Sequence, residues 1–380
     1  MLTRFPEKFK DISIIGAANI IGTIITGIFW FYLATLIPED EYGQISYIIA
    51  LAGITGLLSS IGGNGTIIVF TAKKIPIQST IFIISIIVGS VGSIIVYFII
   101  GEIAASFYVI GYVIFGLSNA DMLGRKQYTL YSKLIIIQKS LFVVSSIVLY
   151  FMFGSSGVVL GFAVSFIPYI WRIIKTFKEI KIDFSILRPR ISFMRNIYVS
   201  DLSRGLTGHL DKLIIGPLFG FVILGNYHLG LQVLSLLTLL PTILIQYILP
   251  QESSGIEPVT IKKYAILSSI GITVLGVVLA PIGIPWMFPK YEDAIVLVQI
   301  FSITVIPKTV TTTLQSKFLA KEESGTVLRG VICYLIAQVI SIIVLGTILE
   351  VIGIAIAYVI GEYSQMLFFL IKNIQVSNKQ

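Results

Sequence analysis

Long apolar runs with almost no charge inside them are the feature of this chain that most restricts its fold. The segments 12–37 and 78–100 contain no charged residue, and each exceeds the roughly 20 residues that a helix needs to cross the hydrocarbon of a bilayer. The runs are continuous and do not alternate as the strands of outer-membrane barrels do. Charged residues make up only 12% of the chain, too few to cover a soluble surface. The sequence therefore predicts an all-α integral membrane protein.

The apolar runs also predict how many helices there are. Assigning about 20 apolar residues to each span gives twelve transmembrane helices, in two sets of six on either side of the longest polar stretch. The predicted spans are 12–37, 43–71, 78–100, 103–120, 134–153, 156–174, 196–218, 221–249, 264–286, 294–316, 327–349 and 351–371.

The distribution of Lys and Arg orients these spans. With the N-terminus in the cytoplasm, 22 of the 27 cations lie in cytoplasmic segments and one, Lys290, lies in an outer loop. Cytoplasmic loops of membrane proteins carry such an excess of cations, so we expect both termini inside the cell and a multi-pass protein of the cytoplasmic membrane. Arg4, Lys8 and Lys10 precede the first run, which is too long for a signal peptide and is expected to remain as the first span.

The basic stretch 177–195 divides the chain into a predicted N-terminal six-helix lobe, 1–176, and a C-terminal six-helix lobe, 196–380. The two lobes share a short outer turn with a Tyr/Gly pair, at 38–43 and 224–227. Six plus six helices in the same orientation predict parallel repeats with a cavity between them. Transport through that cavity is the expected activity.

Four segments carry a family resemblance. They are 33–43, in which Pro38 and an acidic triplet precede Tyr42-Gly43, together with 211–216, 224–230 and 288–294. In order and spacing they resemble the polysaccharide flippases (Wzx-type) of the multidrug/oligosaccharidyl-lipid/polysaccharide exporter superfamily. The resemblance covers nearly the whole chain and implies a MATE-like fold. It also implies an alternating-access transporter that moves a lipid-linked glycan, carried on a polyprenyl phosphate or pyrophosphate, from the inner to the outer leaflet.

The remaining four cations lie within predicted spans, where a cation is unfavourable by roughly 2.5–3.5 kcal/mol. In one interpretation they line the cavity and bind the phosphate or pyrophosphate of a substrate. In the other, each pairs with a carboxylate and ties helices together. The cations are Lys139, Arg204, Lys212 and Lys308, and the coupling or charge-pair carboxylates are Asp201, Asp211 and Glu362.

Residue spacing predicts how some of these charges are arranged. Asp201, Arg204, Gly208 and Asp211 recur at intervals of 3, 4 and 3 and so share one face of the predicted seventh helix. That face is expected to line the water-filled cavity. Three ion pairs remain open at this point: Asp201–Arg204, Arg204–Asp211 and Lys308–Glu362.

Other polar residues have simpler expected roles. Lys139 lies about five residues inside the predicted fifth span, where its side chain can reach the cytoplasmic surface. Asp121 and Arg125 are expected to be solvated at a cytoplasmic helix end. The candidates for a polar cavity lining, which can equally form interhelical hydrogen bonds, are Asn19, Thr23, Thr26 and Gln232.

Several function classes are disfavoured. No phosphate-binding G-x-x-x-x-G-K-[ST] motif and no metal-ligand cluster occurs in the sequence, so we expect a non-enzyme without cofactor or metal, acting as a monomer. The net charge of +8 reflects topology and does not indicate nucleic-acid binding. One alternative is a cation-coupled multidrug antiporter, although the first two spans contain no acidic residue. A less favoured alternative is a membrane-embedded glycosyltransferase or ligase, for which the outer loops are too short.

Overall fold

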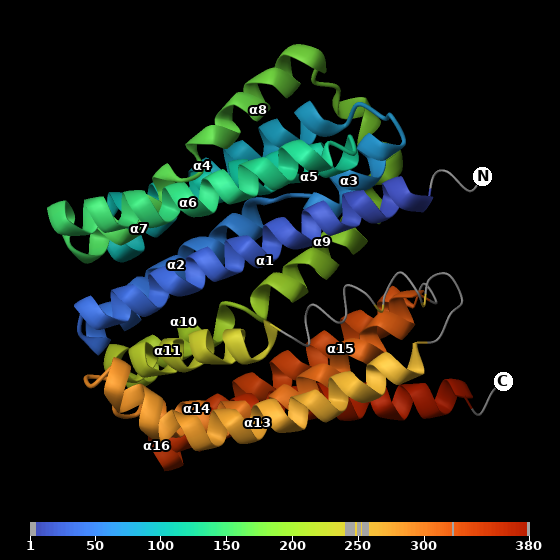
Figure 1. Cartoon of the computed structure of the whole chain (residues 1–380). Coiled ribbons are helices and arrows are strands. Elements are labelled where there is room, and N and C mark those ends of the chain that lie inside the picture. Colours follow the sequence, from blue (N-terminus) through green and yellow to red (C-terminus); the bar gives the residue numbers. More distant parts are fainter. Residues whose placement is uncertain (1–4, 240–247, 249–251, 253–257, 321–322, 378–380) are drawn as a thin grey trace. The chain divides into compact units, whose positions relative to one another are not determined.

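The computed structural model describes residues 5–239, 248, 252, 258–320 and 323–377 and contains only helices, turns and loops in these ranges. Figure 1 shows the arrangement. The helices are α1 (Phe5–Leu36), α2 (Glu39–Ser59), α3 (Asn64–Ala72), α4 (Gln78–Ile100), α5 (Ile103–Gly124), α6 (Tyr128–Phe153), α7 (Ser155–Val164), α8 (Ile167–Glu179), α9 (Ile191–Leu206), α10 (Leu210–Phe219), α11 (Phe221–Leu237), α13 (Val259–Met287), α14 (Ala294–Ser302), α15 (Val305–Ala320) and α16 (Ser324–Ser377), with short 3-10 turns η2 (Phe184–Ile186) and η3 (Arg188–Arg190). The all-helical prediction is confirmed.

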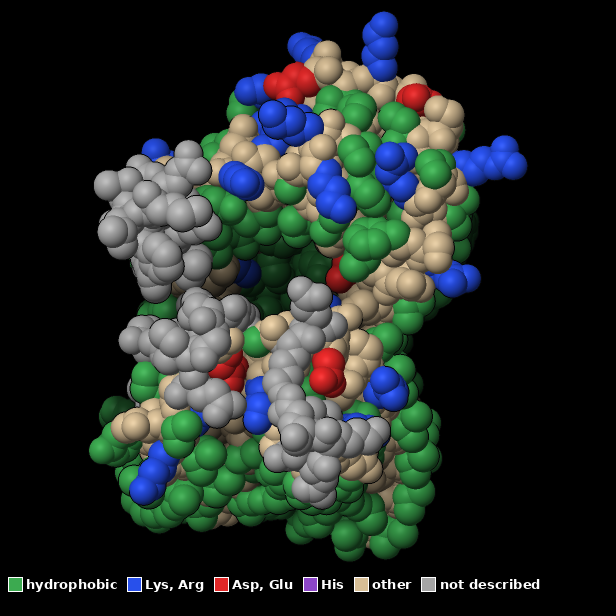
Figure 2. Space-filling view, turned by 90° about the vertical axis from the view of Figure 1, so that its right-hand side faces the viewer, with side chains coloured by type: hydrophobic (Ala, Val, Ile, Leu, Met, Phe, Trp, Pro, Cys, Tyr) green, Lys and Arg blue, Asp and Glu red, His purple; other side chains and the backbone are tan. Residues whose placement is uncertain are grey.

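Eight of the described helical segments are long and apolar enough to cross a membrane, and the bent pair α14–α15 makes a ninth. Their outer surfaces are apolar: the side chains of Phe98, Phe151 and Trp286 are 80%, 70% and 83% exposed. Hydrophobic side chains cover much of the face in Figure 2. Exposure of such large side chains in this number is what a lipid-facing surface requires.

The helix α16 is a hairpin of two antiparallel helices. Glu350 has φ 48° and ψ −124°, outside the helical region, and separates 324–349 from 351–377. Cys333 lies 3.9 Å from the carbonyl oxygen of Ser364, and a Cβ on Gly353 would lie 1.9 Å from that of Leu345. The break falls between the predicted spans 327–349 and 351–371.

The boundaries of the other predicted spans are reproduced to different degrees. The third, 78–100, coincides with α4, and the fifth begins earlier than predicted, at Tyr128. The second is two helices, because Gly62 and Gly63 adopt φ of 83° and 77° between α2 and α3. The eighth predicted span extends into residues 240–247, which lie outside the described residues. The same is true of Arg4, Lys321 and Lys379. The count of twelve spans and the position of the termini stay predictions.

The prediction of one continuous seventh helix is wrong. α9 ends at Leu206 and α10 begins at Leu210, and the turn between them is closed by bonds from Gly208 N to Gly205 O and from His209 N to Leu206 O. Each of these bonds joins residues that are three apart in the sequence, whereas an α-helix bonds residues that are four apart. The turn is therefore tighter than an α-helix and interrupts it. Asp201 and Asp211 therefore lie on separate helices and do not share a face.

The described chain divides into two compact units. Unit 1 comprises 1–29 and 47–210, and unit 2 comprises 30–46 and 211–380. The predicted lobes, 1–176 and 196–380 with the linker 177–195, concern membrane topology and stay a prediction.

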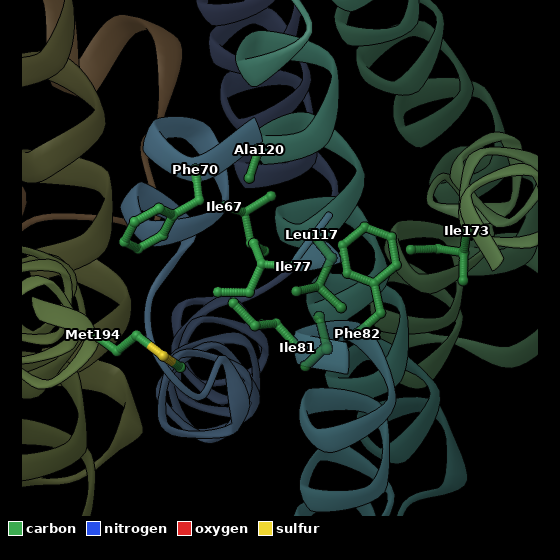
Figure 3. Packing of buried hydrophobic residues seen from close by; sticks show 10 residues of the cluster. Ile67, Phe70, Ile77, Ile81, Phe82, Leu117, Ala120, Ile173 and Met194 are labelled. Carbon is green, nitrogen blue, oxygen red and sulfur yellow. The ribbon is translucent and has the colours of Figure 1, made fainter. Parts of the chain in front are cut away.

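Unit 1 is built from antiparallel hairpins around an apolar core. In the α4–α5 hairpin, Ser93 and Ser106 each donate a hydroxyl to the other's carbonyl oxygen at 2.9 Å. In the α6–α7 hairpin, Ser145 donates to the carbonyl of Gly161 at 2.8 Å. The core lies at one end of the unit, and Figure 3 shows how its side chains interlock. Its members from α3, α4, α5, α8 and α9 and the α3–α4 connection are Ile67, Phe70, Ile77, Ile81, Phe82, Val113, Leu117, Ala120, Ile173 and Met194.

Unit 2 begins with the two Tyr/Gly turns seen in the sequence, which pack against each other. A Cβ on Gly43 would lie 2.0 Å from the carbonyl oxygen of Phe221, and one on Gly225 would lie 2.0 Å from that of Glu39. The starts of α2 and α11 thus cross in the same way from both sides, which only glycine permits. Tyr42, fully buried, donates its hydroxyl to the carbonyl of Trp30 at 3.2 Å.

Candidate functional site

A buried polar cluster in unit 2 joins α10, α11, α15 and α16. At one end, Asp211 is 3% exposed. Its Oδ2 accepts a 2.6 Å hydrogen bond from the Tyr227 hydroxyl, and its Oδ1 lies 3.4 Å from Lys212 Nζ. The structure therefore pairs Asp211 with the neighbouring lysine and a tyrosine, and this carboxylate is satisfied within unit 2.

The second charge pair of the cluster is Lys308 with Glu362. Lys308 Nζ lies 3.6 Å from Glu362 Oε1 and donates to the Tyr358 hydroxyl at 3.4 Å. The Glu362 side chain is 6% exposed, whereas that of Lys308 is 39% exposed. The carboxylate is enclosed by protein, whereas the lysine side chain is partly exposed.

Aromatic rings connect the two pairs. The Phe301 ring centroid lies 5.5 Å from that of Tyr227 and 4.9 Å from that of Tyr358. Tyr227 and Tyr358 lie 6.5 Å apart. The two hydroxyls that bond Asp211 and Lys308 thus belong to one packed group, so a change in one charge pair alters the packing around the other.

Lys308 lies in the second half of its predicted span, just after a break in the helix. α14 and α15 meet at a 44° bend, immediately followed by Pro307, whose ring cannot donate a backbone hydrogen bond. Lys308 is 14 residues after Ala294, about 21 Å along the helix path. That is about two-thirds of the way across a bilayer core about 30 Å thick.

Gln232, predicted to line the cavity, lies beside a buried histidine. Its Nε2 is 3.3 Å from Nε2 of His228. The His228 ring packs 5.0 Å from the rings of both Trp30 and Tyr42. Its Nδ1 is buried and has no hydrogen-bond partner among the residues that the structure describes.

Lys139 is the corresponding cation of unit 1. It lies 11 residues after the start of α6 at Tyr128, about 17 Å along the helix, and not near the helix end as the predicted span implied. Its Nζ lies 6.0 Å from the Phe162 ring centroid. Within the described residues no carboxylate lies within ion-pair distance of it. The sequence did not predict the early start of α6, because residues 128–133 include polar side chains and do not extend the apolar run.

The predicted polar stripe of α1 faces this lysine. A Cβ on Gly22 would lie 3.1 Å from Lys139 Cγ, and Asn19 and Thr26, three residues before and four after Gly22, lie on the same side of α1. The Thr23 and Thr26 hydroxyls donate to the carbonyls of Asn19 and Gly22, both at 2.9 Å. These hydroxyls are satisfied by their own helix, and each retains acceptor capacity for a ligand.

Asp201 and Arg204 have separate roles. Asp201 Oδ2 accepts the backbone N–H of Gly65 at 3.1 Å, at the start of α3. A carboxylate at a helix start is favourable, because it accepts a hydrogen bond from a free N–H and is attracted to the positive end of the helix dipole. Arg204 is exposed and donates to the Ser200 hydroxyl at 2.9 Å. The predicted Asp201–Arg204 pair does not occur among the ion pairs of the described chain.

One buried network was missed by sequence reasoning. Asp121 is fully buried, not solvated, and binds Arg172 at 2.6 Å and Arg125 at 2.8 Å. Arg125 also binds Glu179 at 2.6 Å. Arg172 is the residue that could have indicated this network. It lies next to the predicted end of the sixth span, and an arginine buried there needs a carboxylate partner.

Unit 2 also contains an apolar crevice of about 390 Å³. It is lined by α11, α13, α14 and the end of α1, with Phe31, Leu236, Leu279 and Ile284 among its residues. Its size and lining suit a hydrocarbon chain.

The fold is shared with transporters of known structure. An inward-facing multidrug resistance MATE family transporter of the MOP superfamily is 15% identical, with a TM-score of 0.73 over 94% of this chain and 95% of that one. The lipid II flippase MurJ in an inward closed conformation is 13% identical, with a TM-score of 0.75 over 94% of this chain and 87% of that one. A MOP superfamily transporter from Pyrococcus furiosus is 15% identical, with a TM-score of 0.57 over 97% and 96% of the two chains.

No protein of curated function has a significant sequence match to this chain. A family model described as polysaccharide biosynthesis protein matches residues 32–256, more than half of the sequence. With the MATE- and MurJ-like fold, this match identifies the chain as a member of that polysaccharide biosynthesis family.

Proposed function

We propose that this protein is an alternating-access flippase that moves a lipid-linked oligosaccharide or polysaccharide precursor from the inner to the outer leaflet of the cytoplasmic membrane. Membership of the polysaccharide biosynthesis family and the likeness to a lipid II flippase both support this activity. The proposal includes twelve spans, cytoplasmic termini, two six-helix lobes and a monomeric carrier.

The observation that carries the proposal is Lys139. It lies midway along α6, and the described part of the chain provides no carboxylate at ion-pair distance. A cation at that depth is strongly disfavoured without a counter-charge. The phosphate or pyrophosphate of a lipid-linked glycan supplies this charge when it passes. The stripe of Asn19, Thr23 and Thr26 beside Lys139 offers acceptors for sugar hydroxyls.

Lys308 acts in the same way in unit 2, with Glu362 as its resting partner. Because the lysine is accessible and the glutamate is enclosed, an anionic head group can approach Lys308 and compete with Glu362. Release of Glu362 from this pair then changes the hydrogen bonding of Tyr358 and the packing of Phe301. Lys212 and Arg204 are further substrate-binding candidates, and Asp201 and Asp211 further coupling candidates.

The lipid tail needs no polar path. The polyprenyl chain remains in the hydrocarbon, where transfer of each buried CH₂ is favourable by about 0.8 kcal/mol. The apolar crevice of unit 2 gives part of that chain a protein surface to lie on. Only the anionic, hydrated head group has to be sheltered, which is the task of the cations and polar residues.

A cation-coupled multidrug antiporter is the second candidate, and the enclosed carboxylates Asp211 and Glu362 favour it. Purified protein in vesicles distinguishes the two. A flippase exposes a fluorescent polyprenyl-pyrophosphate sugar to the opposite leaflet and does not exchange an organic cation for protons. An antiporter gives the reverse result, and activity only on the organic cation contradicts our proposal. Neither activity requires the catalytic residues of a glycosyltransferase or ligase.

A further inference from the structure

A basic pocket lies at the end of unit 1, beside the buried network of Asp121, Arg172 and Arg125. Its volume is about 440 Å³, and it is formed where the ends of α3 and α5 meet the segment after α8. Lys74, Arg125 and Lys126 line it, together with Gln78 and Ile180. Figure 2 shows that Lys and Arg side chains gather on the part of this face formed by unit 1.

The two lysines occupy equivalent positions in two equivalent turns. After α3, Ile75 N bonds to Phe70 O and Lys74 N to Thr71 O; after α5, Gln127 N bonds to Met122 O and Lys126 N to Leu123 O. Lys74 has φ 60° and Lys126 φ 59°. This left-handed position of the turn is normally glycine, because a Cβ is disfavoured there. Both turns therefore carry a lysine at a position where the backbone conformation favours a residue without a side chain.

Neither lysine is paired with a carboxylate of the described residues. Two carboxylates adjoin the pocket through Arg125, which binds Asp121 and Glu179, and Asp121 also binds Arg172. In the described part of the chain, Lys74 and Lys126 belong to no ion pair. Cations at helix C-termini are mildly favourable, but Lys73 and Arg125 already hold the capping positions of the two helices. The additional positive charge is therefore available to a ligand.

The pocket is held open by close packing. A Cβ on Gly124 would lie 2.6 Å from Thr71 Cβ and 3.0 Å from Ile68 O, so the ends of α3 and α5 are in direct contact. The core in Figure 3 lies directly on these helices, with Phe70 of α3 and Ala120 of α5. The two turns thus keep a fixed separation, which spares a ligand the cost of ordering them.

The helix α8 places the pocket at the level of lipid head groups. Ile167, Ile170, Trp171 and Ile174 form its exposed apolar face, and Lys175 Nζ lies 5.3 Å from the Trp171 ring. Trp followed by Lys is typical of the boundary between hydrocarbon and water. Ile180 in the pocket is nine residues after Trp171, about 13 Å further if the rise of a helix continues. That distance reaches the head-group layer.

We propose that this pocket binds a phosphate group at the cytoplasmic surface, with Lys74 and Lys126 contacting its oxygens and Arg125 fixed beside them. Both an anionic phospholipid and a soluble phosphate offer this chemistry. The site is separate from Lys139 and Lys308 and does not depend on the transport proposal.

The test replaces both lysines by glycine, Lys74→Gly together with Lys126→Gly. Glycine is the preferred residue in these turns, so the variant is expected to fold and to melt at or above the wild-type temperature. The matched control, Lys178→Ala with Lys290→Ala, removes the same charge from exposed positions. Full-length protein in neutral detergent is titrated with phosphatidylglycerol in one arm and with inorganic phosphate in the other.

Retention of phosphatidylglycerol is read by native mass spectrometry and phosphate binding by calorimetry. We expect the glycine variant to bind about thirtyfold more weakly than the wild type, with the control unchanged. Loss confined to phosphatidylglycerol identifies a lipid head group, and loss in the phosphate arm identifies a soluble ligand. Equal binding by wild type and glycine variant in both arms overturns the proposal.

Discussion

Lys308 and Glu362 form an unequal ion pair: their charged atoms lie 3.6 Å apart, but the glutamate side chain is enclosed and the lysine side chain is partly exposed. Removing one partner of a buried pair strands the other, and here the two removals strand different groups. Without Lys308, an enclosed carboxylate loses its counter-charge. Without Glu362, the lysine can still reach water.

The first prediction follows from this asymmetry. Lys308→Met should destabilise the protein by about 3 kcal/mol, and Glu362→Gln by less than about 1 kcal/mol. Melting temperatures of the two purified variants in one detergent measure the difference. Equal losses would show that the two groups are equally solvated, contrary to the structure.

A second prediction concerns Tyr227, whose hydroxyl donates to the buried Asp211 at 2.6 Å. Tyr227→Phe leaves that oxygen without its donor, and we expect a loss of about 1–3 kcal/mol. Tyr264→Phe is the matched control, because this tyrosine is 64% exposed and should change little. Combining Tyr227→Phe with Asp211→Asn should cost less than the two single changes added together. An additive result would argue against the bond.

A third prediction concerns the contact between α2 and α11. Alanine at Gly43 or at Gly225 places a methyl group 2.0 Å from a backbone carbonyl oxygen, so the helices must separate and little folded protein should be recovered. Gly271→Ala in α13 is the control. A Cβ there meets nothing within 4 Å, and the change should raise stability by about 0.5–1 kcal/mol. Normal yields of Gly43→Ala would contradict the packing described for unit 2.

A fourth prediction separates Asp201 from Arg204. Asp201→Ala removes the carboxylate that accepts Gly65 N–H and should lower stability by about 1 kcal/mol without being required for substrate binding. Arg204→Ala loses one exposed hydrogen bond and should leave the melting temperature unchanged. If Arg204 binds substrate anions, the Arg204→Ala variant reduces glycan export although its melting temperature is unchanged. A stable, fully active Arg204→Ala protein removes this residue from the site.

Hydropathy predicted the helical class and most of the apolar spans because charge-free runs such as 78–100 have one physical explanation. It could not predict the break at 207–209, since Thr207, Gly208 and His209 are neutral and do not interrupt an apolar run. It also placed Lys139 near a helix end, because the first turns of α6 are polar although they are helical.

The charge pairs show a similar limit. The sequence left Asp201–Arg204 and Lys308–Glu362 open, the first from spacing along one helix and the second from depth in the membrane. Of these two pairs, only the second is an ion pair in the described part of the chain. The first pair required both partners to lie on one helix. Asp201 instead accepts a hydrogen bond from the backbone N–H of Gly65, which is 136 residues away in the sequence. Likewise the sequence indicates that Gly43 and Gly225 are turn residues, whereas in the structure they allow the close approach of two helices.

The most direct test of the central claim is the leaflet distribution of a lipid-linked glycan in cells that lack their own flippase. The cells would produce Lys139→Ala, Lys139→Arg or, as the exposed control, Lys290→Ala, at matched levels in the membrane. The account predicts that Lys139→Ala leaves the glycan in the inner leaflet, that Lys139→Arg restores part of the export, and that Lys290→Ala equals the wild type. Export by Lys139→Ala at the wild-type rate would contradict it.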